Sequence, residues 1–248
     1  MIKGKRLSRP YRAELLVLFF PLALAFFSCS ARIDGIVKEG GAADLILKAS
    51  LQSRTAALIS SLRAFMGNAD MAAPVLDGPA IGRSMAASPG IKTVSLVNTT
   101  PSALDGSLQI TNVGDFLASG NTKSRFVTFA EGKDAGSSSI IVILDRDSVP
   151  EFISKLSPEV SDYLSALMAP VVLGETSSAK EYLDLVASIY GRPLSDEIAQ
   201  ARIQAFVEFP RPITDISGGI ATGKKAEFNI PLLNILVMEN PLSYKVSW

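Results

Sequence analysis

The stretch SSSIIVILDRDSVPEF, residues 137–152, marks the point where a group of strands gives way to a group of helices. Residues 140–144 are apolar at every position, which is typical of a strand that lies in the middle of a sheet with both faces covered. The polar residues 145–147 end that strand. Ser148-Val-Pro-Glu151 then has the spacing of a capping box, with proline tolerated in the first helical turn. We therefore expect a strand over residues 139–144 and a helix directly after it.

Short strands are expected before this stretch. Residues 31–38 and 43–51 flank Glu39-Gly40-Gly41, and the second segment alternates apolar and polar side chains, which is typical of a hairpin with one buried face. A helix is expected from Ser53 to a stop at Gly67, because the apolar residues between them keep helical spacing. A weaker helical pattern covers residues 79–87, and further strands are expected over residues 92–98, 107–113 and 125–130.

Helices and then strands are expected after it. Ser157-Pro158-Glu159 restarts the helical pattern, and the capping box Ser178-Ala-Lys-Glu181 opens a helix that ends at Gly191. Strand patterns return over residues 202–209, 224–230 and 242–248. Because strands and helices occur in groups, the sequence predicts an α+β fold with a largely antiparallel sheet and helices packed on one face. Residues 29–248 suit one such domain, and two lobes dividing near Asp145 are the alternative.

The N-terminus has the pattern of a secretory signal. Residues 1–12 carry five basic side chains and no acid, and residues 15–27 form an uninterrupted apolar run. This run is shorter than the about 20 residues that a transmembrane helix needs. It ends at Ser28-Cys29-Ser30, which holds the single cysteine of the chain. A lone thiol in an exported chain has no intramolecular disulfide partner. Lipid attachment is one use for Cys29; an ordinary secreted protein cut near Ser28, or a buried free cysteine, are the alternatives.

This segment resembles the lipobox of bacterial lipoproteins. Phe26 is apolar at minus three, Ser28 is small at minus one, and cysteine follows at once. A relaxed box of this kind is similar to those of spirochaete-type envelope lipoproteins. The resemblance implies cleavage after Ser28, acylation of Cys29 with chains such as palmitate, and a lipoprotein anchored in a membrane of the cell envelope, on its periplasmic or surface face. Two acyl chains and an amide-linked chain bind a membrane firmly, whereas one chain alone binds only marginally.

Charge and composition exclude several classes of protein. Without residues 1–28 the chain carries a net charge of minus four, so it has no electrostatic footprint for nucleic acid. The chain has no histidine, which removes the usual general base of nucleophile triads and most zinc sites. We therefore expect a protein that is not an enzyme, with no metal and no cofactor.

One glycine-rich segment has the spacing of a phosphate-binding loop. In GGIATGKK, residues 218–225, the hydroxyl residue that should follow the lysine and hold magnesium is Lys225. The residues after it alternate as a strand, so no helix N-terminus is available to bind a phosphate. We expect a glycine-rich turn between strands.

The remaining candidates are one acidic pair and one apolar segment. Asp145 and Asp147 follow the central strand and define an alternative function, a carboxylate-dependent hydrolase. Their spacing also suits a loop followed by the charges of a helix start. Residues 232–238 are apolar except Asn234. They suit a short buried helix or strand, with a lid, a membrane-dipping loop or part of a ligand cavity as alternatives.

The layout of the whole chain resembles one further group. The lipobox, an early strand pair followed by a helix, and a C-terminal segment with Phe209-Pro210, Gly218-Gly219 and Gly223-Lys224 that ends in Tyr244-Lys-Val-Ser-Trp248 are similar to uncharacterised lipoproteins of the LppM-like type. This resemblance implies an envelope protein with lipid-binding character. We expect a lipid-anchored, non-enzymatic binding or assembly module whose partner is an apolar envelope lipid or an envelope protein.

Overall fold

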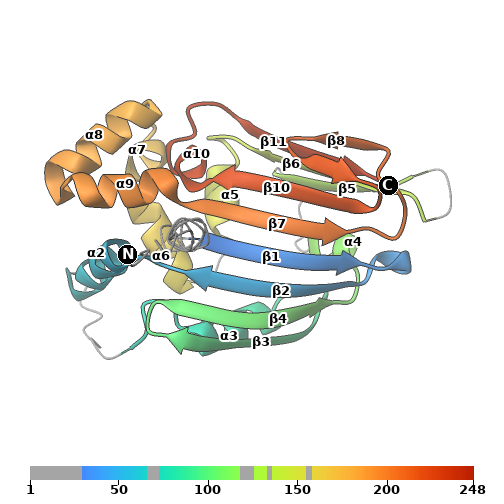
Figure 1. Cartoon of the computed structure of the whole chain (residues 1–248). Coiled ribbons are helices and arrows are strands. Elements are labelled where there is room, and N and C mark those ends of the chain that lie inside the picture. Colours follow the sequence, from blue (N-terminus) through green and yellow to red (C-terminus); the bar gives the residue numbers. More distant parts are fainter. Residues whose placement is uncertain (1–29, 66–72, 118–125, 133–135, 155–157) are drawn as a thin grey trace, which may run out of the picture.

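The structure is a computed structural model that describes residues 30–65, 73–117, 126–132, 136–154 and 158–248 (Figure 1). Cys29 and the apolar run before it lie outside the described residues, as does the expected helix stop at Gly67. Within the described parts of the chain, no helix is both long enough and apolar enough to cross a bilayer.

The strands form two sheets in the described residues. The larger sheet has the order β3-β4-β2-β1-β7-β10-β9, and the smaller has the order β5-β6-β11-β8. Neighbours are antiparallel except for β1 and β7, which run parallel. The bounds are β1 Ser30–Val37, β2 Ala43–Ser50, β3 Ile91–Thr100, β4 Ala103–Ile110, β5 Val127–Glu131, β6 Ser138–Leu144, β7 Arg202–Glu208, β8 Asp215–Ser217, β9 Ile220–Thr222, β10 Lys225–Pro231 and β11 Leu242–Ser247.

The helices gather mainly at one end of the two sheets, while α3 lies against β3 (Figure 1). Their bounds are α2 Ser53–Phe65, α3 Gly78–Ala86, α4 Val113–Leu117, α5 Val149–Ser154, α6 Pro158–Leu167, α7 Ala169–Val172, α8 Ala179–Tyr190, α9 Arg192–Gln200 and α10 Leu232–Val237. A short 3-10 turn, Glu39–Gly41, joins β1 to β2.

Two apolar cores hold these elements together. The first lies among the helices, where Met168 and Leu236 are fully buried and Tyr182 and Ile198 pack beside them. The second lies between the two sheets and is made by alternate residues of facing strands. Strands from both sides of residue 145 pair in each sheet, β1 with β7 and β6 with β11. The sheets are therefore not divided into an N-terminal and a C-terminal lobe.

Several expectations from the sequence are confirmed. The fold class is α+β with a largely antiparallel sheet. The first two strands form the expected hairpin, and β6 lies between β5 and β11 in the middle of its sheet. Ser178 and Glu181 form the expected capping box, and α8 ends at Gly191.

Other boundaries were predicted wrongly. The strand expected over residues 107–113 runs from Ala103 to Ile110, and Val113 instead begins the short helix α4. Helix α9 was missed because its buried apolar positions are sparse, Leu194 and Ile198 being separated by a polar run. Strands β8 and β9 were missed because three residues each are too few to show a period of two.

Candidate functional site: an apolar cavity between the sheets

An apolar cavity of about 390 Å³ lies between the two sheets. The larger sheet contributes inward-facing residues of β1, β2, β7 and β10, and the smaller sheet contributes residues of β5, β6 and β11. Side chains alternate along each strand, so Ala205 and Val207 of β7 face Ile140 and Val142 of β6 across the cavity while their sequence neighbours face outward. The cavity is therefore a direct product of the strand pattern.

The small side chain of Ala205 in β7 leaves part of this space open, because a larger side chain there would reach into the gap. The space beside Gly35 of β1 is already occupied, because a Cβ atom there would lie 2.8 Å from Cδ2 of Leu45. Several lining residues that face the interior, such as Leu45 and Val207, are only partly buried. Protein interiors are normally close-packed, so this partial exposure marks unfilled space.

The corner where β8 leads into β9 packs against two residues that line the cavity, Phe228 and Tyr244. Gly218 adopts a left-handed conformation with φ of 74°, and Gly219 lies against the ring of Phe228. A Cβ atom at Gly218 would lie 2.5 Å from Cδ1 of Tyr244. The rings of Phe228 and Tyr244 both line the cavity and meet edge to face at 6.0 Å between centroids. The corner can hold these rings because glycine occupies both of its positions.

This corner also settles what the segment GGIATGKK does. Gly218 and Gly219 form the corner, Gly223 supplies the left-handed residue of the turn from β9 to β10, and Lys224 Nζ donates to the carbonyl of Pro210 at 2.8 Å. No helix follows, because β10 begins at Lys225. The expected glycine-rich turn between strands is confirmed, and the segment is not a phosphate-binding loop.

The parts of the cavity lining near α4 and near the C-terminus are also apolar. Val113 and Phe116 of α4 line the side near β5. At one end of the intersheet core, the rings of Phe209 and Trp248 lie 4.5 Å apart, with Phe129 6.5 Å from Trp248. Trp248 is held by a reciprocal pair of backbone hydrogen bonds with Ser138, each 2.9 Å long.

Two titratable residues occur among the lining residues. Burial raises the pKa of Tyr244 above its usual value, so its phenol stays neutral at physiological pH. The Lys245 ammonium forms an ion pair with Asp215 at 2.7 Å. Apart from these two residues, the lining of the cavity is apolar.

The acidic pair beside the central strand has a structural role at Asp145. Its Oδ1 accepts the backbone N–H of Ser148 at 2.9 Å, and the Ser148 hydroxyl accepts the backbone N–H of Asp145 at 2.9 Å. Asp145 thus caps the turn that leads into α5, a role that the expected pairing of Ser148 with Glu151 did not include. Hydrogen bonds from the side chain and then the backbone of Ser148 lower the pKa of Asp145. Asp147 is exposed.

We expect the substitution Asp145→Ala to lower the free energy of unfolding by about 1 kcal/mol, the usual effect of losing an N-cap. Asp145→Asn keeps an oxygen acceptor and should retain most of this stability near neutral pH. Because the pKa in the folded state is lowered, the charge stabilises the fold above the unfolded-state pKa of about 4 and loses that effect as pH falls through the folded-state pKa. Urea unfolding across this range measures both effects. Equal stability of the alanine variant and the wild type at neutral pH would contradict the capping role.

Arg146 is a structural contact that the sequence did not reveal. Its guanidinium donates to the carbonyls of Met238 at 3.2 Å, Val237 at 3.4 Å and Glu175 at 2.5 Å. The first two carbonyls belong to the C-terminal end of α10, where Met238 adopts a left-handed conformation. Arg146 therefore fastens α10 to the end of the central strand. Its position between two aspartates suggested an acidic cluster, and nothing local to it indicates a partner ninety residues away.

The apolar segment over residues 232–238 is a short buried helix, α10, followed by its cap. Leu236 is fully buried, and Val237 and Met238 are nearly so. The simplest of the sequence interpretations is confirmed, and the segment packs in the helical core rather than at the cavity.

Neither a metal site nor the lipid site is visible in the described residues. No cluster of acidic or thiol groups in those residues could hold a metal ion. Cys29, the predicted lipid attachment site, lies outside them, so its acylation stays a prediction. Ser30, the residue after it, is the first of β1.

Comparison with known proteins adds little to this geometry. No known protein family and no curated protein match the chain. The folded domain of the Mycobacterium tuberculosis lipoprotein LppM is similar at 9% identity and a TM-score of 0.38, covering 89% of each chain. Yeast LTA4 hydrolase in complex with bestatin is similar at 11% identity and a TM-score of 0.29, covering 90% of this chain and 28% of that one. Neither similarity is strong enough to support an argument about function, and neither bears on a spirochaete-type lipoprotein.

Proposed function

We propose that this protein is a cell-envelope lipoprotein, anchored through Cys29, whose two-sheet core binds an apolar ligand such as the acyl chain of an envelope lipid. The observation that carries the proposal is the apolar cavity of about 390 Å³ between the sheets. Binding rather than catalysis is the function that its lining supports, because Tyr244 is kept neutral and the Lys245 ammonium is held by Asp215.

The size of the cavity suits part of a lipid. Ligand pockets in proteins commonly measure about 300 to 1,000 Å³. If a methylene group occupies roughly the 30 Å³ that a water molecule takes in the liquid, the cavity holds on the order of a dozen carbon atoms. Each methylene moved out of water contributes about 0.8 kcal/mol. The cavity can therefore hold part of a single acyl chain, and burial of that part is enough for tight binding.

The energetic cost of an empty cavity also supports a bound ligand. In engineered cores, vacant apolar space lowers stability by roughly 24 cal/mol per Å³. A larger side chain at Ala205 would fill part of this space. A sequence that keeps a small residue at this position keeps room for a ligand and loses some stability of the empty fold.

The alternative function, a hydrolase built on Asp145 and Asp147, receives less support. A carboxyl group that acts as general acid near neutral pH requires a raised pKa, whereas hydrogen bonds from Ser148 lower the pKa of Asp145. The two acids belong to the start of α5 and do not line the cavity between the sheets.

Native mass spectrometry tests the proposal on protein made without residues 1–28 and purified without detergent. We expect an additional mass on the folded protein, identified as an apolar lipid after solvent extraction. The substitution Ala205→Phe should lower the bound fraction about tenfold or more, because losing the burial of two methylenes already has this effect on affinity. A protein that carries no ligand and takes up no added fatty acid would contradict the proposal.

A matched control lies next to Ala205 in the sequence. Gln204 is on the same strand and faces the outside of the sheet, so Gln204→Phe adds a comparable side chain without filling the cavity. We expect this variant to bind ligand as the wild type does. Equal loss of ligand in both variants would place the ligand outside the cavity.

A further inference from the structure

The anchored end of the domain is fixed by the start of β1. Ser30 pairs with Ser50 of β2 and with Arg202 of β7. Ser50 lies three residues before α2 begins, and Arg202 lies two residues after α9 ends. Strand β1 therefore begins at the end of the sheets where the helices gather (Figure 1). Cys29 directly precedes a paired strand residue, so a lipid on its thiol would have no linker before the domain.

Helices α8 and α9 form a hairpin that extends from this end of the larger sheet (Figure 1). Helix α9 has nine residues, and at a rise of 1.5 Å per residue its length is about 13 Å. The two helices meet at Gly191, whose φ is 90°. The tip of the hairpin is therefore separated from the start of β7, and of its neighbour β1, by about the length of α9.

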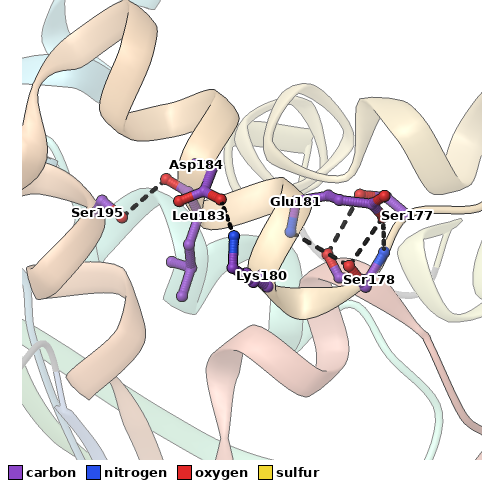
Figure 2. Close-up of polar contacts among 7 residues, drawn as sticks. All are labelled: Ser177, Ser178, Lys180, Glu181, Leu183, Asp184 and Ser195. Atoms are coloured by element: carbon purple, nitrogen blue, oxygen red, sulfur yellow. Dashed lines mark hydrogen bonds and ion pairs between the residues drawn. The ribbon is translucent and has the colours of Figure 1, made fainter.

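A side-chain hydrogen bond joins α9 to α8, and further polar contacts order the start of α8 (Figure 2). The Ser195 hydroxyl of α9 donates to the carbonyl of Leu183 in α8 at 2.9 Å. At the start of α8, Ser178 and Glu181 bond reciprocally, and Lys180 forms an ion pair with Asp184 at 2.6 Å. Tyr182 and Val186 bury the inner face of α8 in the helical core. The outer face of α8 is therefore presented in a fixed orientation.

That outer face is apolar toward the tip. Leu185 and Ile189 are four residues apart and share one side of the helix, and their exposed fractions are 50% and 61%. Tyr190, at the last position of α8, is 52% exposed. Tyrosine is a preferred residue at the boundary between lipid and water. The next exposed residue, Arg192, has the charge that attracts lipid phosphate groups.

We propose that Leu185, Ile189 and Tyr190 form a membrane-contacting face that enters the interfacial layer of the bilayer beside the lipid on Cys29. This inference rests on the proposed anchor and is independent of the proposed cavity ligand. The anchor leaves no linker, so an acylated Cys29 brings the helical end of the domain to the membrane surface. A bilayer interface accepts apolar side chains to a depth of about 5 to 10 Å, a distance that the hairpin can span.

The test uses the full chain, processed and acylated in a bacterial host and reconstituted into phosphatidylcholine and phosphatidylglycerol vesicles whose acyl chains carry bromine. In the variant Ile189→Cys the added thiol is the one available for a fluorescent label, since Cys29 carries the lipid. We expect bromine to quench that label. The matched control is Ile220→Cys. Ile220 is 68% exposed, but it lies on β9 opposite Glu227 of β10, which pairs with Phe206 in the half of β7 farther from the helices. We expect no quenching there.

A second variant separates insertion from mere proximity. Adding Leu185→Asp to the Ile189→Cys chain places a charge on the same helix face and should abolish the quenching. Adding Ile36→Asp, at the far end of β1, should leave it unchanged. Circular dichroism checks that each variant folds.

The remaining outcomes distinguish failure of the membrane face from failure of the proposed anchor or of the proposed cavity ligand. Equal quenching at positions 189 and 220, or none at either, contradicts a defined membrane face. Disulfide cross-linking between the introduced thiols of two Ile189→Cys chains, with the label protected from bromine, assigns the face to a second copy of the chain. If the intact mass shows no added lipid, the proposed anchor is wrong and so is this inference. If an acylated chain is quenched but retains no cavity ligand, the membrane face is supported and only the proposed ligand is contradicted.

Discussion

Cells that express the Cys29→Ala chain are expected to incorporate no labelled palmitate into it, whereas the wild-type chain becomes labelled and sediments with the membranes. The thiol is the single cysteine of the sequence, so no other residue can replace it as the site of a thioether-linked lipid. Because each buried methylene contributes about 0.8 kcal/mol, loss of two long chains moves the protein from the membrane to the soluble fraction. This change is the largest that a single substitution in the chain should produce.

The control for this experiment is Ser30→Ala, which changes the neighbouring residue and keeps the thiol. We expect it to be labelled as the wild type is. The anchor would be contradicted if the wild type took up no label, or if label on the Cys29→Ala chain were undiminished. In either case Cys29 would belong to one of the alternatives that the sequence leaves open, an ordinary signal cut near Ser28 or a free thiol.

The substitution Arg146→Ala is expected to lower the free energy of unfolding by about 3 kcal/mol, since each buried acceptor left without its donor costs about 1 to 3 kcal/mol. The acceptors are the carbonyls of Val237 and Met238, residues that are almost fully buried, and the carbonyl of Glu175. Arg146→Lys should recover part of this loss, because an ammonium cannot reach all three carbonyls with the planar geometry of a guanidinium.

Arg32→Ala provides the comparison. Arg32 forms a surface ion pair with Asp34 at 2.7 Å and lies over the ring of Phe206. Because both charged side chains are substantially exposed, we expect a much smaller loss of stability than for Arg146→Ala. Chemical denaturation of both variants measures the difference. If Arg146→Ala destabilises the protein no more than Arg32→Ala does, the guanidinium does not fasten α10 to the central strand.

The contrast between Asp145 and Arg146 shows what the sequence could and could not predict. A helix start near these residues is visible in the sequence because capping depends on neighbours a few positions apart. The part that Asp145 plays in the cap was still missed, since Ser148 can bond either forward or backward along the chain. The partners of Arg146 are set by the packing of α10, which no local pattern reports.

The cavity, too, was predictable from the sequence only in part. The apolar run over residues 140–144 predicted a strand in the middle of a sheet, which is confirmed. It also predicted that both faces would be covered, which is wrong on one side: Ile140 packs against the intersheet core, whereas Ile143 is 44% exposed. That this core belongs to two sheets was not predicted, because the crossing from β8 to β9 depends on a corner of two glycines and on strands of three residues. Unfilled volume depends on how the side chains of both sheets fit together, so sequence periodicity alone could not show it.

The parallel pairing of β1 with β7 has a mechanical consequence. Strand β1 is bonded along its whole length to β2 on one side and along nearly all of it to β7 on the other, and it begins at the residue after the proposed anchor. A pull on the lipid therefore acts along the axis of a central strand. The hydrogen bonds of the β1–β2 ladder lie across this axis, so those bonds are loaded together in shear instead of opening one after another from an edge. A lipid anchor at Cys29 would therefore transmit force to the larger sheet in shear, through two strand ladders.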